Sequence, residues 1–169
     1  VRQMILTNSD KERGSIIERL LPIQKEDFID LFKEMSNLPV TIRLLDPPLH
    51  EFLPNSQQEI QRTANLMAIT EQQLADRIKD LSEFNPMLGT RGVRLGVMVP
   101  EIYDMQVQAI FLAAIEVFKK YKIVANPEIM IPLISANKEV DLVRDRIRKV
   151  FSQLNLSLIH ISEPTRPLS

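Results

Sequence analysis

The sequence predicts an α/β fold built on a parallel sheet or barrel. Two short runs, residues 40–45 and 128–134, are rich in β-branched and aliphatic residues, which is typical of buried strands. Longer segments with apolar residues at helical spacing lie between and after these runs. The order strand, helices, strand, helix indicates parallel strands, because such strands need crossover helices that also cover the sheet.

Two helices are expected before the first strand. Residues 9–20 form a short amphipathic segment, which Pro22 is predicted to close because proline lacks the N–H that continues a helix. Residues 24–35 form the second helix, with an apolar stripe that should face the core.

The first strand contains one charged residue. Pro39 precedes residues 40–45, Asp46-Pro47-Pro48 ends them, and Arg43 lies inside. We expect this strand to be buried, and burying a guanidinium without a partner costs several kcal/mol. Arg43 therefore needs either a structural carboxylate or a bound anion.

A proline-bounded loop and two helices are predicted after that strand. The loop, residues 49–54, contains His50. A histidine without a clear acidic partner is more typical of a structural hydrogen-bonding residue than of a proton carrier or phosphoacceptor. Residues 56–67 and 70–81 form the helices, and the second begins with a Thr-x-x-Gln capping box.

Residues 85–96 hold three of the four glycines in the chain. Gly89 and Gly92 flank Arg91, and glycine accepts positive φ, so we expect a turn that presents one guanidinium. An arginine presented in this way typically binds an oxyanion, because its planar fork fits a carboxylate or phosphate with two hydrogen bonds. The alternative is a surface arginine on an ordinary loop.

The C-terminal half contains the longest predicted helix, residues 101–121, and a further helix over 138–154 that follows the second strand. Residues 93–97 alternate like a strand, but glycines and a proline at short intervals leave their state open. The two helices are predicted to turn inward the apolar residues Ile102, Met105, Ala109, Leu112, Ala113, Phe118, Val140, Val143, Ile147, Phe151 and Leu154.

Composition excludes several classes of function. With 21 basic and 22 acidic residues the net charge is −1, which gives no electrostatic footprint for nucleic acid or an anionic membrane. The absence of cysteine excludes disulfides, thiolate metal sites and thiol nucleophiles, and fits a reducing compartment. The apolar runs are too short for a membrane span, so we expect a cytoplasmic protein. Because the first residue is not methionine, we expect the chain to start inside a longer one.

Four blocks carry a resemblance to the pyruvate, phosphate dikinase family: residues 39–54, 85–96, 100–103 and 127–133. The second block reads Asn-Pro-Met-Leu-Gly-Thr-Arg-Gly-Val-Arg-Leu-Gly, with Thr90 where the family often has histidine. Phosphoenolpyruvate synthase and the first enzyme of the sugar phosphotransferase system share an arginine-bearing strand and a glycine-arginine loop. The run Leu-Asp-Pro-Pro-Leu-His-Glu-Phe and the helical excursion resemble the dikinases more.

The resemblance implies that residues 1–156 are a fragment of a phosphoenolpyruvate/pyruvate-binding domain. Its fold would be a partial (β/α)8 TIM barrel, with about two barrel strands, helices and a long helical insertion. Residues 92–98 would belong to the long connection between the two strands. In such a domain Arg43 and Arg91 would bind the phosphoryl group and the substrate, and no catalytic residue or metal ligand is expected in this chain.

The implied parent is a phosphotransferase that interconverts pyruvate, ATP and phosphate with phosphoenolpyruvate, AMP and diphosphate through a phosphohistidine. The Mg²⁺ ligands, the enolate-protonating cysteine and the domains for ATP and phosphohistidine would lie outside this chain. The parent is expected to be a homo-oligomer. The alternative is a non-catalytic α/β module that binds anions weakly.

Residues 157–169 do not continue the family pattern. They resemble a translated sequencing adapter, so we predict a non-native tail in which His160 has no function.

Overall fold

The sheet is parallel and has two strands in the computed structural model, which describes residues 10–46, 53–81 and 91–162. Strand β1 (Pro39–Arg43) pairs with β2 (Asn126–Met130), from Pro39 opposite Asn126 to Arg43 opposite Met130. This confirms the predicted α/β class and the parallel strands. A closed barrel is not seen in the described residues.

The second strand is shifted from its predicted position at residues 128–134. β2 starts two residues earlier and ends at Met130, whose carbonyl accepts a 2.9 Å hydrogen bond from the Leu44 N–H. A parallel strand has partners only as far as its neighbour extends, so the end of β1 sets the end of β2.

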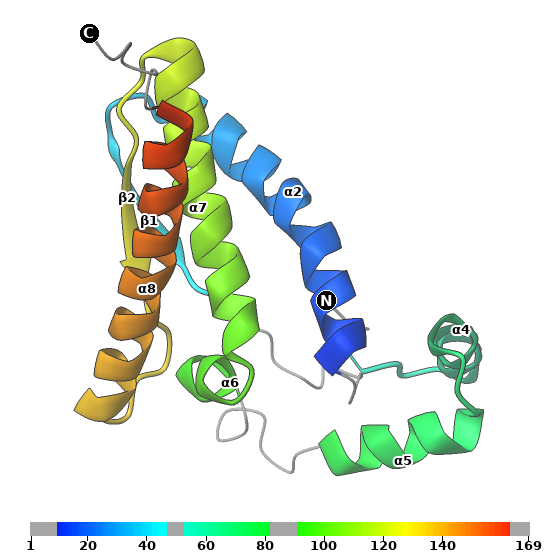
Figure 1. The fold of residues 1–169 in the computed structure, drawn as a ribbon. Helices are drawn as coiled ribbons and strands as arrows, with labels where there is room; N and C mark the ends of the chain where they lie inside the picture. Colours follow the sequence, from blue (N-terminus) through cyan, green and yellow to red (C-terminus); the bar gives the residue numbers. More distant parts are fainter. Residues whose placement is uncertain (1–9, 47–52, 82–90, 163–169) are drawn as a thin grey trace, which may run out of the picture.

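Helix α2 (Asp10–Glu34) is continuous, so the prediction that Pro22 closes a helix is wrong. Both halves pack on the core: Leu20 contacts one apolar cluster, and Ile29 and Phe32 belong to another. Figure 1 shows α2 next to α7 (Pro100–Tyr121), with which it makes extensive contact. Burial on both sides of Pro22 outweighs the lost backbone hydrogen bond.

Helix α7 is the centre of the fold and lies between α2 and α8 (Asn137–Ser162) in Figure 1. It begins at Pro100, where proline costs no hydrogen bond because the first N–H groups of a helix have no intrahelical acceptor. The helix predicted over 138–154 is longer than expected and crosses residue 157. The non-native tail itself stays a prediction.

Residues 93–98, whose state the sequence left open, form the short helix α6 (Val93–Met98). It contacts both α7 and α8. Its buried residues are Val93, Leu95 and Gly96, so tertiary packing, and not the strand-like alternation, decides its conformation.

The sheet has one buried and one exposed face. In β1, Val40 and Ile42 pack into the core, whereas Thr41 and Arg43 lie on the opposite face. On this exposed face the Thr41 hydroxyl donates a 2.8 Å hydrogen bond across to the Glu128 carboxylate. Side chains on this face are therefore accessible beside the sheet.

Helices α4 (Gln57–Met67) and α5 (Glu71–Leu81) confirm the predicted helical excursion. They have a small core of their own, formed by Leu53, Ala64 and Leu74. The predicted capping box is present: the Gln73 N–H donates to the Thr70 hydroxyl at 3.2 Å, and the Thr70 N–H donates to the Gln73 side chain at 3.1 Å. Figure 1 shows this pair of helices away from the sheet.

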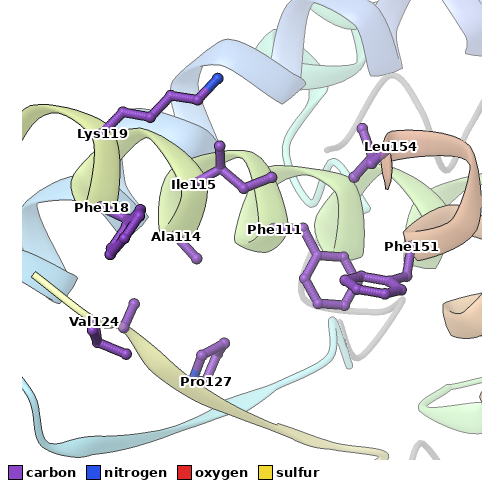
Figure 2. A pocket seen from close by; sticks show the side chains of 10 residues that line it. Phe111, Ala114, Ile115, Phe118, Lys119, Val124, Pro127, Phe151 and Leu154 are labelled. Carbon is purple, nitrogen blue, oxygen red and sulfur yellow. The ribbon is translucent and has the colours of Figure 1, made fainter. Parts of the chain in front are cut away.

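An apolar pocket of about 470 Å³ lies between α7, β2 and α8 (Figure 2). Phe118 and Phe151 line it and are 52% and 47% exposed, so the prediction that both face a closed core is wrong. Phe111 meets Phe151 edge to face, with ring centroids 5.2 Å apart. None of the described helices is long and apolar enough to cross a membrane.

Candidate functional site

The two arginines predicted to bind an anion meet at the carboxyl edge of the sheet. Arg43 is the last residue of β1, and Arg91 lies two residues before α6. Because parallel strands end at the same edge, loops after the strands converge there, and binding sites of α/β folds form at this edge. The residue that joins the two arginines is Asp46, three positions after Arg43.

Asp46 accepts hydrogen bonds from both guanidinium groups. The Arg91 Nε donates to Oδ1 at 3.0 Å and its Nη2 donates to Oδ2 at 2.9 Å, which is a two-bond fork. The Arg43 Nη2 also donates to Oδ2. The Asp46 side chain is 5% exposed, that of Arg91 17% and that of Arg43 54%. The three side chains together carry a net positive charge, and Arg43 is the accessible part.

For Arg43, the structure contradicts the predicted burial and shows the predicted carboxylate partner. The prediction that it is a buried charge is wrong, because Arg43 lies on the exposed face of β1. The carboxylate partner that its position demanded is present as Asp46. Asp46 was predicted only as part of the strand end. Its spacing three residues from the single charge of the strand is the signal that could have identified it.

Gly92 forms the turn next to Arg91 with a positive φ, as predicted. Its φ is +57°, and a Cβ there would lie 2.9 Å from the Leu133 Cβ. The following N–H, of Val93, donates a 3.0 Å hydrogen bond to the Pro132 carbonyl. Glycine thus permits both the left-handed conformation and the close approach that fastens the Arg91 segment to the chain after β2.

Gln106 holds the end of β1 in place. This residue of α7 is 4% exposed. Its Oε1 accepts a 2.8 Å hydrogen bond from the Leu45 N–H, and its Nε2 donates to the Arg43 carbonyl at 3.2 Å. Gln106 was not predicted as a site residue, although a polar residue within the apolar stripe of a helix is a visible signal in the sequence. Its amide fixes the backbone that carries Arg43 and Asp46.

Replacing Gln106 by methionine is expected to speed hydrogen exchange of the peptide spanning residues 43–46 by about fivefold, because one hydrogen bond contributes on the order of 1 kcal/mol. Exchange in the full-length protein would be followed by mass spectrometry of its proteolytic peptides. Gln108→Met, a partly exposed position on the same helix, is the matched control and should leave this peptide unchanged. Equal exchange in the two variants would show that Gln106 does not hold the strand end.

Other predicted positions lie outside the described residues: His50, Gly89 and Thr90. Across residues 10–46, 53–81 and 91–162, no three His, Asp or Glu side chains gather as a metal ion would require. That the Mg²⁺ ligands lie elsewhere stays a prediction.

Comparison with known proteins gives one family. The family described as "PEP-utilising enzyme, PEP-binding domain" matches residues 2–166. The chain is 46% identical over 154 residues to pyruvate, phosphate dikinase of Rhizobium meliloti (strain 1021) and to that of Rickettsia prowazekii (strain Madrid E). It is 44% identical over 164 residues to the chloroplastic pyruvate, phosphate dikinase of Mesembryanthemum crystallinum. These matches cover 91–94% of this chain but only 17–18% of each relative. The resemblance to dikinases is thereby confirmed.

Proposed function

The chain belongs to the PEP-utilising enzymes, matching their PEP-binding domain, and from this premise we propose that it is the phosphoenolpyruvate-binding part of a longer phosphotransferase. The whole protein would interconvert pyruvate, ATP and phosphate with phosphoenolpyruvate, AMP and diphosphate through a phosphohistidine. Strands β1 and β2 would be two of the eight strands of a (β/α)8 barrel. Identity near 45% to three dikinases supports this assignment.

The observation that carries the proposal is the pair of arginines on Asp46. Phosphoenolpyruvate has a phosphate and a carboxylate, and a guanidinium fork matches either group. Arg43, on the exposed face of β1 beside the carboxyl edge, can exchange Asp46 for an oxygen of the substrate. Fixed positive charge at this position would stabilise the negative charge that spreads over a phosphoryl group during transfer.

The remaining parts of the machinery are proposed from the resemblance alone. Mg²⁺ would neutralise charge on the phosphoryl group when bound, and its ligands would come from the rest of the protein. Domains for ATP and phosphate, a homo-oligomeric state and a cytoplasmic location belong to the same proposal. Within this chain, Arg43 and Arg91 bind and orient the substrate anion, Asp46 holds both arginines, and Gln106 holds the backbone of Arg43 and Asp46.

The test begins with the genomic DNA on both sides of the coding sequence of this chain. We expect a longer reading frame, whose purified product consumes phosphoenolpyruvate only when AMP and diphosphate are both supplied. The 169-residue chain alone is expected to give no turnover, because metal activation and proton delivery to the enolate need groups that it lacks.

Two results would contradict the proposal. One is a complete reading frame no longer than this chain. The other is Mg²⁺-dependent turnover by the purified 169-residue chain that Arg91→Ala abolishes. Turnover by the full-length protein without any need for diphosphate would instead indicate a relative that uses phosphoenolpyruvate in a different reaction.

A further inference from the structure

Helix α7 contains a buried hydroxyl that no described residue satisfies. The Tyr103 side chain is 2% exposed, and its Oη has no hydrogen-bond partner in the described part of the chain. Burying a hydroxyl without a partner is unfavourable, and such groups are rare in folded proteins. A group of this kind next to a binding site calls for a functional reason.

Tyr103 lies on the face of α7 that meets the end of β1. It precedes Gln106 by three residues, so both side chains point from one face of the helix. Gln106 contacts the backbone of Arg43 and Leu45. Because helical side chains lean toward the N-terminus of their helix, the Tyr103 side chain lies over the turn that precedes this contact. The next residue along the chain from Leu45 is Asp46.

Gly96 leaves room for the Tyr103 ring. A Cβ built on Gly96 would lie 2.1 Å from the Tyr103 Cε2 and 2.6 Å from its Cζ, so the ring fills the space that the missing side chain leaves. The ring packs among the buried apolar residues of α6 and the β1 end, Leu44 and Val93 among them. Among the described residues, the hydroxyl is thus placed by packing on the ring and not by a hydrogen bond of its own.

Two charges of the site act on this hydroxyl. Burial raises the pKa of Tyr103 well above its usual value, the Asp46 carboxylate raises the pKa further, and Arg43 lowers it. The hydroxyl therefore keeps its proton in the neutral pH range and can serve as a hydrogen-bond donor. The carboxylate whose charge acts on this hydroxyl is that of Asp46, which makes it the candidate acceptor.

We propose that Tyr103 is a positioning residue that donates its hydroxyl proton to a hydrogen bond with Asp46 when Arg43 turns from Asp46 to the anionic substrate. Arg43 is the arginine that can leave, because it holds Asp46 through one nitrogen and is 54% exposed, whereas Arg91 holds it with a fork and is 17% exposed. Tyr103 then replaces the lost donor on a carboxylate that is 5% exposed. This inference rests on the proposed function and deepens it.

The first arm of the test is a double-mutant cycle that needs no catalysis. In the full-length protein, Tyr103→Phe keeps the ring over Gly96 and should leave hydrogen exchange of residues 43–46 unchanged. In an Arg43→Ala background, the Tyr103 hydroxyl is expected to donate its hydrogen bond to Asp46 already. There, Tyr103→Phe should speed this exchange by about tenfold. Tyr121→Phe, at the exposed end of α7, is the control and should have no effect in either background.

The second arm uses substrate. Tyr103→Phe should raise the KM for phosphoenolpyruvate by about tenfold with kcat unchanged, because the lost bond belongs to the bound state throughout the reaction. Faster exchange in both backgrounds to the same extent, or in neither, would overturn the inference. The full-length protein could be inactive and still show that the effect of Tyr103→Phe on exchange depends on Arg43. That result would overturn the proposed function and not the bond between Tyr103 and Asp46.

Discussion

Changing Arg43 to lysine in the full-length protein is expected to lower kcat/KM for phosphoenolpyruvate by about a hundredfold, since charge-assisted hydrogen bonds contribute about 1.5–3 kcal/mol each. Lysine keeps the charge but presents a single ammonium at the end of a flexible stem. It cannot place two parallel donors on two oxygens of one phosphate or carboxylate. Steady-state assays with varied phosphoenolpyruvate would measure the loss.

The control for this prediction depends on the structure. Arg146 is not a neutral position for a control, because it forms a fork with Asp104, with its Nε 3.0 Å from Oδ1, and so links α8 to α7. Arg62, on the exposed side of α4, is the better choice, and Arg62→Lys should leave the kinetics unchanged. Equal kinetics for the Arg43 and Arg62 variants would leave Arg43 with only a structural role, as the partner of Asp46.

Local signals in the sequence predicted most helices correctly. The caps at Ser56 and Thr70 depend on atoms a few residues apart, so they are visible in the sequence. The error at Pro22 has the opposite origin, because long-range packing of α2 on α7 decides whether a helix survives a proline. The end of β2 was also predicted wrongly, because it depends on pairing with β1. Paired residues of the two strands, such as Thr41 and Glu128, are 87 positions apart in the sequence.

The difference between local and long-range signals also explains which parts of the candidate site were predicted. Arg43 and Arg91 were predicted because a charge in an apolar strand and an arginine beside glycine are local anomalies. That both would bind Asp46 was not predictable, because Arg91 and Asp46 are 45 positions apart. The signals of Gln106 and Tyr103 are weaker: each places polar atoms within the buried stripe of α7. The role of these atoms can be assigned only when the position of the end of β1 is known.

The 169-residue chain alone is expected to be aggregated or molten. Among the described residues each strand has one neighbour, so the outer edges of β1 and β2 offer unpaired N–H and C=O groups. The apolar pocket between α7, β2 and α8 adds large exposed side chains. Phe118 is 52% exposed, Val124 59% and Phe151 47% (Figure 2). Surfaces of this kind recruit other chains.

The chain alone should therefore show a helical far-UV circular dichroism signal without a cooperative melt, together with oligomers in size-exclusion chromatography. We expect the apolar area buried by these helices to be too small to offset an ordering cost of roughly 1–2 kcal/mol per residue. The full-length protein is the control, because the proposed barrel would pair both strand edges and cover the pocket. A soluble monomer of 169 residues with a sharp two-state thermal transition would contradict this prediction and would mean that the segment folds as an independent domain.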